Sequence, residues 1–364
     1  MRVGVVMGTR PEIIKLAPVV WALAERHPDV ECRVLLTGQH GRFAHELCAE
    51  LGVPVHDDLE VMAPHPGDLL ARAVSGCDGW IEAERPDAVV VQGDTTSVLA
   101  GALAAFYRKV PVAHVEAGLR TGDLTRPFPE EANRRLVGGI AAMHFAPTAG
   151  ARDALLAEAV PSEAIVVVGN TVVDAVRRYA VSDAARGPGE RRALVTIHRR
   201  ESWGTEFEQL CLGVADLADA EPDLRVDFVM HPNPALQARA RETLGHADRI
   251  RLLQPMTYVP FVELLSAADV VLTDSGGIQE EAASLGTPLV VLREVTERPE
   301  GVAAGAAFLG GVTREGLASA VEEALAAGRG DARDLYGDGH AGERIADMLA
   351  AGRMMPERAW GGPA

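Results

Sequence analysis

The stretch VVLTDSGGIQEE (residues 270–281) decides the fold of this 364-residue chain. A short run of valine and leucine ends at polar residues, two glycines follow, and a segment suited to a helix start comes next. Strands that are buried on both faces of a parallel sheet read as continuous apolar runs, whereas half-exposed strands alternate. The stretch therefore predicts a strand, a glycine turn and a helix, which is the repeating unit of a doubly wound α/β fold.

The same kind of apolar run recurs on both sides of a polar stretch at 183–192. Earlier runs stand at 3–7, 33–36, 88–91, 111–115, 144–146 and 165–168, and later ones at 194–197, 226–230, 250–253, 270–272 and 289–292. Helices are expected between them, for example at 98–107, 233–244 and 261–267. At this length two domains are the default. We expect Rossmann-like domains over 1–175 and 176–350 and a loose tail over 351–364.

Composition excludes several classes of protein. The chain is 48% hydrophobic and 24% charged, as soluble globular proteins are, and its formal net charge of −17 argues against a nucleic-acid partner. Its apolar runs are too short for a membrane span, and the first is too short for a signal peptide. The cysteines form no CxxC pair and no metal-ligand spacing, which indicates a cytoplasmic protein with reduced thiols: Cys32, Cys48, Cys77 and Cys211.

Polar residues that directly follow a strand are the candidates for function, because ligands of open α/β sheets bind outside the carboxyl ends of the strands. GTRPE (8–12) follows the first run and starts a helix. Free backbone amides at that point, with Arg10 and Lys15, would hold a phosphate. The alternative is a capped helix with solvated charges.

Three carboxylates stand at comparable places. Asp94 follows the third run, although an aspartate there commonly caps a helix. Glu116 ends the next strand on the same face as His114, and a simple ion pair with Arg120 is the alternative. Glu130 begins a helix, where an acidic residue complements the helix dipole in any case. It is a candidate only because Asp94 and Glu116 are candidates as well.

Two segments of the second half suggest anion binding. His198 ends the strand at 194–197 and precedes two arginines, which favours phosphate contact or acid–base work; His231 has the same placement and a weaker case.

Ser275, Gly276 and Gly277 would let a diphosphate approach a helix start, with Glu281 placed for ribose hydroxyls and Arg298 for phosphate. The alternative is a tight turn with a surface ion pair. No apolar run is followed by GxGxxG or GxxxxGK, so no dinucleotide cofactor is expected.

In order along roughly residues 3–312, the chain resembles the non-hydrolysing UDP-N-acetylglucosamine 2-epimerases. The matching segments are GTRPEIIKLAPV (8–19), TGQH (37–40), VQGDTTS (91–97), HVEAGLRTGD (114–123), RPFPEEANRR (126–135), VGNTVVDA (168–175), TIHRRES (196–202), LTDSGGIQEEAASLGTP (272–288) and TERPEGVAAG (296–305). The resemblance implies two Rossmann-like domains of the GT-B type with the active site in the cleft between them. It also implies interconversion of UDP-GlcNAc and UDP-ManNAc without NAD or a metal, by a homodimer.

The same resemblance implies a role for each candidate residue. The sugar and diphosphate would face Arg10, Lys15, Asp94, Glu116, Glu130 and His198, and uracil would lie at Phe261 and near Met256. Phosphate would be held by Ser275, Gly276 and Gly277, ribose by Glu281 and the diphosphate by Arg298. Four positions depart from the family pattern: Arg42, Ser202, Met256 and Ala306. Arg42 replaces a glutamine of substrate-regulated members, which puts activation by UDP-GlcNAc in doubt.

The implied reaction eliminates UDP to give 2-acetamidoglucal and then adds it back. Acid–base groups are needed on two faces of the sugar ring, and Asp94, Glu116, Glu130 and His198 are the candidates for catalysis. Three alternatives stay open: a GT-B glycosyltransferase that uses a UDP-sugar, a hydrolysing epimerase that releases ManNAc and UDP, and a non-catalytic nucleotide-sugar sensor. A sensor or a transferase would not need all three carboxylates, so their presence favours the epimerase.

Overall fold

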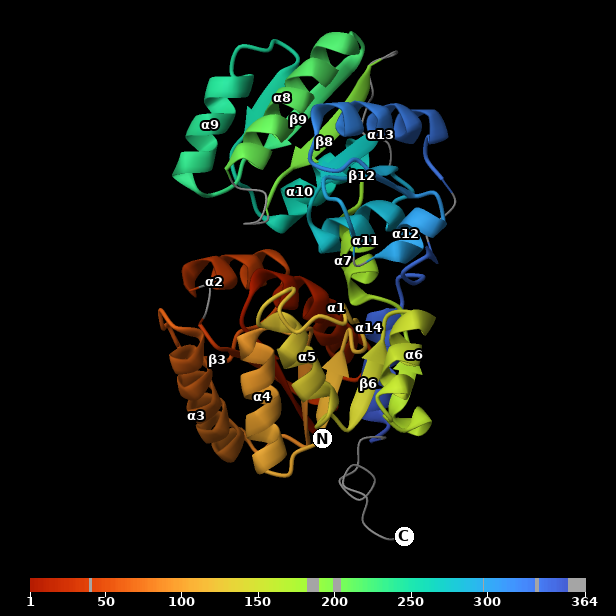
Figure 1. Ribbon diagram of the computed structural model, residues 1–364. Coiled ribbons are helices and arrows are strands. Elements are labelled where there is room, and N and C mark those ends of the chain that lie inside the picture. Colours follow the sequence, from red (N-terminus) through yellow and green to blue (C-terminus); the bar gives the residue numbers. More distant parts are fainter. Residues whose placement is uncertain (39–40, 182–189, 199–203, 297, 331–333, 353–364) are drawn as a thin grey trace. The chain divides into compact units, whose positions relative to one another are not determined.

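The chain forms two compact α/β units. The computed structural model describes residues 1–38, 41–181, 190–198, 204–296, 298–330 and 334–352, and Figure 1 shows its elements. The first unit is Met1–Ala175 together with the segment that starts at Gly337, and the second is Val176–Tyr336.

The described part of the first unit holds a parallel sheet with the strand order β3-β2-β1-β4-β5-β6-β7. The strands are β1 (Arg2–Met7), β2 (Glu31–Leu36), β3 (Asp57–Asp58), β4 (Ala88–Gln92), β5 (Val112–Val115), β6 (Met143–Ala146) and β7 (Ile165–Val167). The helices are α1 (Arg10–Arg26), α2 (Gly41–Glu50), α3 (Pro66–Glu84), α4 (Thr96–Tyr107), α5 (Glu130–Gly138), α6 (Ala149–Ala157) and α14 (Ala341–Ala350), and α7 (Thr171–Tyr179) leads into the second unit. The chain reverses its winding between β1 and β4, which makes the edge of these two strands the expected ligand position.

The second unit repeats this plan with the order β10-β9-β8-β11-β12-β13 in its described residues. Its strands are β8 (Arg191–Thr196), β9 (Leu224–Val229), β10 (Ile250–Leu253), β11 (Val270–Thr273), β12 (Leu289–Val291) and β13 (Ala307–Leu309). Its helices are α8 (Thr205–Ala220), α9 (Pro234–Leu244), α10 (Tyr258–Ala267), α11 (Gly276–Ser284), α12 (Pro299–Ala303) and α13 (Arg314–Ala327). Here the winding reverses between β8 and β11.

Every apolar run that the sequence marked as a strand is one, and the two doubly wound parallel sheets are confirmed. The centres of these strands are fully buried, as Val5, Val90 and Leu272 illustrate. Two strands were missed, both at the edge of a sheet: β3 consists of two aspartates, and β13 has three residues. Neither contains a long apolar run, because an edge strand buries less side-chain surface.

The expected division was wrong at the C-terminal end, where residues 337–350 were assigned to the second domain. Helix α14 instead packs against α1 of the first unit. Arg26 donates hydrogen bonds to Glu343 at 3.1 Å and to Asp347 at 3.0 Å, and the Gly342 amide donates to Asp174 at 2.7 Å. An amphipathic helix near the end of a chain buries its apolar face where a groove is open, whatever domain precedes it.

A glycine motif, the C-terminal tail and membrane-spanning helices are the remaining features that the sequence analysis considered. The segment GDGHAG (337–342) has the GxGxxG spacing, but it precedes α14 and follows no strand in the described residues. All but the first two residues of the predicted tail lie outside the described residues. In the described part of the chain, no helix combines the length and the apolar character needed to cross a membrane.

Candidate active site

The turn after β1 starts α1 and presents two cations. Thr9 occupies the N-cap with extended backbone, and Pro11 lies in the first turn, where it lacks only a hydrogen bond that the helix would not make. Arg10 is exposed at this helix start. Lys15 lies one turn further on, only 6% exposed, and makes an ion pair with Glu116. Lys15 is therefore part of a buried charge pair and not a solvated surface lysine.

Glu116 stands directly after β5 with a backbone φ of +61°, a left-handed conformation that is uncommon for a residue other than glycine. Its Oε2 accepts hydrogen bonds from the Lys15 ammonium and, at 2.8 Å, from the Gln92 side-chain amide. Backbone strain of this kind costs about 1–3 kcal/mol and tends to occur at functional sites. The expected alternative pair between Glu116 and Arg120 does not form, because Arg120 binds Glu158 at 2.7 Å.

Asp94 does not cap α4, since Thr95 occupies that position and accepts from the Val98 amide. One Asp94 carboxylate oxygen instead accepts from Arg134 at 2.5 Å, and the Asp94 carbonyl accepts from the Asn133 side chain at 2.9 Å. About a quarter of the Asp94 side chain is exposed, 28% by area.

Burial raises the pKa of Asp94, and the nearby charges act in both directions. Arg134 lowers the pKa of this carboxyl, Glu116 and Glu130 raise it, and Lys15 lowers it. The two neighbouring carboxylates thus make proton uptake by Asp94 easier.

Glu130 and Glu131 share the first turn of α5 but differ in their surroundings. Glu131 is fully buried, and its carboxylate accepts from the backbone amides of Thr121 and Gly122 at 3.1 and 3.3 Å. Glu130 is half-buried and close enough to Asp94 to raise the pKa of that carboxyl. The structure therefore brings Asp94, Glu116, Glu130 and Lys15 together in the first unit, and Glu131 has a structural role.

His114, on β5, is no acid–base group. Its ring is 1% exposed, and Nε2–H donates to the Gly93 carbonyl at 2.7 Å. Burial lowers the pKa of His114 to about 3, so the ring is neutral at physiological pH. His114 holds the turn in front of Asp94.

In the second unit, His198 follows β8 with its backbone amide donating to the buried Asp274 carboxylate at 2.8 Å. The ring of His231, which follows β9, lies 5.9 Å away between centroids. Burial lowers the pKa of His231, against an opposing effect of Asp274. The two histidines with the same predicted placement are thus neighbours at the ends of adjacent strands. Ser202 lies outside the described residues.

The glycine turn after β11 leads directly into a helix, as the sequence predicts. Ser275 is the N-cap of α11, and Gly276 and Gly277 are its first residues. Arg298 crosses this helix start, because a Cβ atom built on Gly276 would lie 3.2 Å from the Arg298 Cζ. Arg298 is held there by Glu280, whose Oε1 accepts from Nε at 2.9 Å. Free helix amides and a guanidinium at one point are an arrangement that commonly binds phosphate in proteins.

The remaining predicted contacts lie near this turn in the sequence or on α10. Phe261 and Glu281 are each 5% exposed, and Met256 is half-buried on the connection between β10 and α10.

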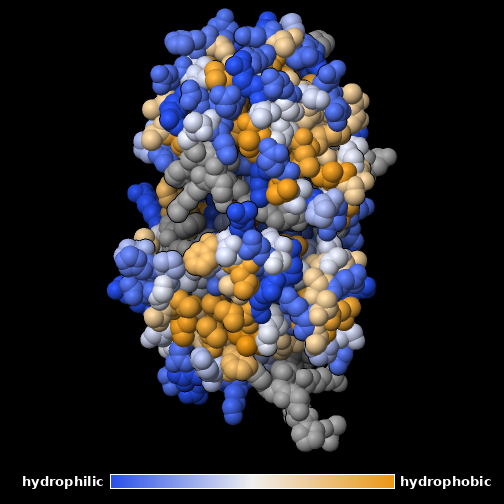
Figure 2. Space-filling model, in the orientation of Figure 1, coloured by the Kyte–Doolittle hydropathy of each residue, from blue (hydrophilic) through white to orange (hydrophobic). Residues whose placement is uncertain are grey.

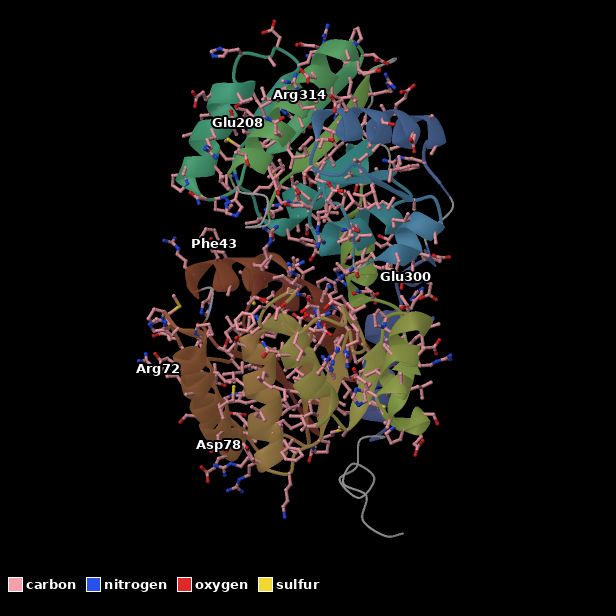
Figure 3. The ribbon with its side chains drawn as sticks, in the orientation of Figure 1. Phe43, Arg72, Asp78, Glu208, Glu300 and Arg314 are labelled. Atoms are coloured by element: carbon pink, nitrogen blue, oxygen red, sulfur yellow. The ribbon has the colours of Figure 1, made fainter. Side chains whose placement is uncertain are left out.

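Four residues that interact with the predicted site residues were not predicted from the sequence: Glu12, Gln92, Arg134 and Tyr336. Tyr336 is 3% exposed, and burial together with Glu280 and Glu300 (labelled in Figure 3) raises its pKa. Nothing in the local sequence distinguishes Arg134 from the other arginines, because its partner Asp94 is 40 residues away. Gln92 lies inside one of the quoted motifs, and so does Glu12. Among the described residues, no cluster of His, Cys, Asp and Glu has an arrangement for a metal ion.

Known proteins of one family are similar to this chain over almost its whole length. A family model described as UDP-N-acetylglucosamine 2-epimerase matches residues 22–350. The chain is 43% identical to a probable UDP-N-acetylglucosamine 2-epimerase of Ralstonia nicotianae, covering 96% of this chain and 99% of the relative. It is 42% identical to the UDP-N-acetylglucosamine 2-epimerase of Escherichia coli K12, covering 97% of this chain and 100% of that protein.

Among solved structures, the chain is similar to the UDP-GlcNAc 2-epimerase of Neisseria meningitidis bound to UDP-GlcNAc. The TM-score is 0.88 at 36% identity, covering 96% of this chain and 100% of the other. The family match, the identity to its relatives and the carboxylate cluster agree with one another. This chain belongs to the UDP-N-acetylglucosamine 2-epimerase family.

Proposed function

We propose that this chain is a non-hydrolysing epimerase that interconverts UDP-GlcNAc and UDP-ManNAc. The observation that carries the proposal is the gathering of Asp94, Glu116, Glu130 and Lys15 at the carboxyl edge of one sheet, in a chain of this family. The C2–H of the sugar is not acidic, so direct proton removal is slow. Elimination avoids this difficulty and is redox-neutral, so it requires no cofactor.

In the proposed elimination, a carboxylate takes the C2 proton while the C1–O bond breaks. The C2–H electron pair becomes the C1–C2 double bond of 2-acetamidoglucal, and the C1–O pair leaves on the UDP oxygen. Addition of UDP with protonation of C2 from the opposite face completes the inversion. Asp94, Glu116 and Glu130 supply the acid and base, which is where a raised pKa of Asp94 is useful.

The departing diphosphate needs positive charge that is already in place, since preorganised charge usually contributes more to catalysis of this type than any other effect. Arg298 and the α11 start at Ser275, Gly276 and Gly277 are proposed to hold it. Glu281 takes the ribose, and Phe261 and Met256 lie beside uracil. Arg10, Lys15 and His198 complete the proposed contacts to sugar and diphosphate.

We also propose that the protein is cytoplasmic and forms a homodimer. Location in the cytoplasm is supported by four free cysteines, of which three are buried. A homodimer is supported by apolar side chains on the outer side of α4 and the neighbouring α5, where Tyr107 is 71% and Leu136 56% exposed. Figure 2 shows hydrophobic surface over α4. Such patches mark interaction surfaces, and closed two-fold dimers are the commonest assembly. Light scattering of the purified protein measures its mass.

The test of the reaction is NMR of UDP-GlcNAc with purified protein in deuterium oxide. Carboxyl groups exchange protons with solvent much faster than a turnover of about 10 per second, so UDP-ManNAc should carry deuterium at C2. A glycosyltransferase would leave C2 untouched, and a hydrolysing epimerase would accumulate free ManNAc and UDP. Full protium at C2 of the product would exclude the elimination.

A further inference from the structure

Glu12 is a buried carboxylate that joins two turns of the first unit. It lies in the first turn of α1 and is 1% exposed. Its Oε2 accepts from the Gly8 backbone amide at 2.7 Å, and its Oε1 accepts from the hydroxyls of Thr9 at 2.6 Å and Thr95 at 2.8 Å. Gly8 and Thr9 form the turn after β1, and Thr95 lies in the turn after β4. Because β1 and β4 are neighbouring strands, Glu12 ties these turns at the point where the winding reverses.

Both turns carry residues of the proposed active site. Arg10 follows Thr9 directly, and Asp94 precedes Thr95 directly. The turn after β1 has no freedom of its own, since a Cβ atom on Gly8 would lie 2.0 Å from the Ser97 Oγ. A shift of the Glu12 carboxylate would therefore move one turn against the other.

We propose that Glu12 is a positioning residue for the epimerisation, which fixes the α1 start with Arg10 relative to Asp94. This inference rests on the proposed function of the site. Glu12 itself touches no reacting atom, because its oxygens are occupied by the two turns. Its effect comes through geometry, and a misplacement of about 1 Å can reduce catalysis by about 100-fold.

The charge state of Glu12 supports this role. Burial raises the pKa of Glu12 to about 7, although its three hydrogen bonds lower it, and Asp94 adds a smaller increase. Other charges nearby are already paired: Lys15 of α1 with Glu116 from β5, and Arg134 of α5 with Asp94. A proton on Oε2 would point at the Gly8 amide, which is itself a donor, and a proton on Oε1 would have to be donated to a threonine hydroxyl that donates to the carboxylate. The carboxylate is thus the form that accepts all three bonds, and it is lost as the pH falls below about 7.

The experiment compares wild type with Glu12→Gln. The amide keeps the shape but cannot accept all three bonds: with Oε1 toward the threonines its NH₂ group faces the Gly8 N–H, and with Oε1 toward Gly8 its NH₂ group reverses the bonds to Thr9 and Thr95. We expect kcat to fall about 10- to 100-fold, while the dissociation constant of UDP changes much less, because Arg10 and Lys15 are the only proposed diphosphate contacts in the first unit and the proposed contacts to uracil, ribose and phosphate at Phe261, Glu281 and Arg298 belong to the second. The acid limb of the wild-type kcat–pH profile near pH 7 should disappear in the variant.

The matched control is Asp174→Asn. Asp174 is also a largely buried carboxylate that accepts from a glycine amide, at 2.7 Å from Gly342, and burial raises its pKa to about 6. It lies outside the proposed site, so its replacement should leave kcat within about two-fold. If Asp174→Asn reduces kcat as much as Glu12→Gln does, the special role of Glu12 is refuted.

A second pair of variants keeps the test decisive if Glu12→Gln does not fold. The Thr9 hydroxyl makes no cap bond to α1, so Thr9→Val removes its bond to Glu12 while Thr9→Ser retains it. Thr9→Val should reduce kcat, whereas Thr9→Ser, which keeps the hydroxyl, should leave kcat near the wild-type value. Folded Glu12→Gln or Thr9→Val with wild-type kcat overturns the inference, whereas wild-type protein that does not epimerise UDP-GlcNAc overturns the proposed function instead.

Discussion

Lys15 and Glu116 form a buried ion pair across 101 residues of sequence, with each side chain only 8% exposed. The pair joins the first helix of the chain to the end of β5. Glu116 also accepts from Gln92 at the end of β4, so three elements meet at one carboxylate. Two charges that are removed from water stabilise the fold only while both are present.

Removal of one partner of this pair should be more harmful than removal of both. Lys15→Met removes the ammonium partner of the buried Glu116 carboxylate, and we expect the free energy of unfolding to fall by about 3 kcal/mol. The double variant Lys15→Met/Glu116→Gln should recover part of this loss. Urea denaturation of the two single variants and the double variant measures the coupling. Strictly additive effects would show that the pair makes no net contribution.

Replacement of each carboxylate of the proposed site by its amide should remove turnover. Asp94→Asn, Glu116→Gln and Glu130→Gln are each expected to reduce kcat by about 100-fold or more, the usual range for a general acid or base. UDP should still bind in calorimetry. Glu82→Gln is the control, since this exposed carboxylate on α3 only pairs with Arg108. Near-normal turnover in any two of the three site variants would contradict the assignment.

The sequence predicted the sheets well because buried parallel strands need continuous apolar runs. It also pointed to Asp94, Glu116 and Lys15, which lie near one another in the structure because each directly follows such a run or the turn behind it. It could not predict what each group pairs with. Arg134, which binds Asp94, and Glu12, which binds Thr95, lie 40 and 83 residues from their partners. Such pairs depend on the order of strands in the sheet, which no local pattern contains.

The C-terminal helix shows the same limit. The local sequence does not contain the information about which surface this helix packs on. Only the groove beside α1, with Arg26 and Asp174 as partners, determines that α14 joins the first unit.

Arg298 should contribute more to UDP binding than a surface arginine does. Arg298→Met removes the guanidinium that crosses the α11 start, and we expect UDP affinity to fall by about 10- to 100-fold. Arg298→Lys should recover only part of it, because an ammonium cannot donate two parallel hydrogen bonds. Arg314→Met is the control, since Arg314, labelled in Figure 3, pairs with Asp216 and both side chains are exposed. Equal losses in Arg298→Met and Arg314→Met would point to a general charge effect.

Arg42 permits a prediction about regulation. It is 91% exposed and donates to Glu46 one helical turn away on α2, which leaves it an ordinary surface pair. We expect hyperbolic kinetics from UDP-ManNAc without added UDP-GlcNAc, measured by NMR of the reverse reaction. Arg42→Gln is the informative variant, because it introduces the residue of substrate-regulated family members. A strict requirement of the wild type for added UDP-GlcNAc would refute the prediction.

Glu12 should give the fold a measurable dependence on pH with a definite sign. Burial raises its pKa from 4.5 to about 7, so between these values the folded chain binds a proton that the unfolded chain has lost. The stability that this proton contributes is fully present below pH 4.5 and is lost as the pH rises through about 7. The loss is about 3 kcal/mol, at about 1.4 kcal/mol per pKa unit.

Glu12→Gln has no such proton. Its free energy of unfolding relative to that of the wild type should therefore increase by about this amount between about pH 4.5 and about pH 8, which urea denaturation at both pH values measures. Asp174→Asn should behave in the same direction with a midpoint nearer pH 6, because the pKa of Asp174 is raised to about 6. Parallel stability curves for wild type and Glu12→Gln would mean that Glu12 stays ionised in the fold, and the acid limb of the kcat profile would then need another origin.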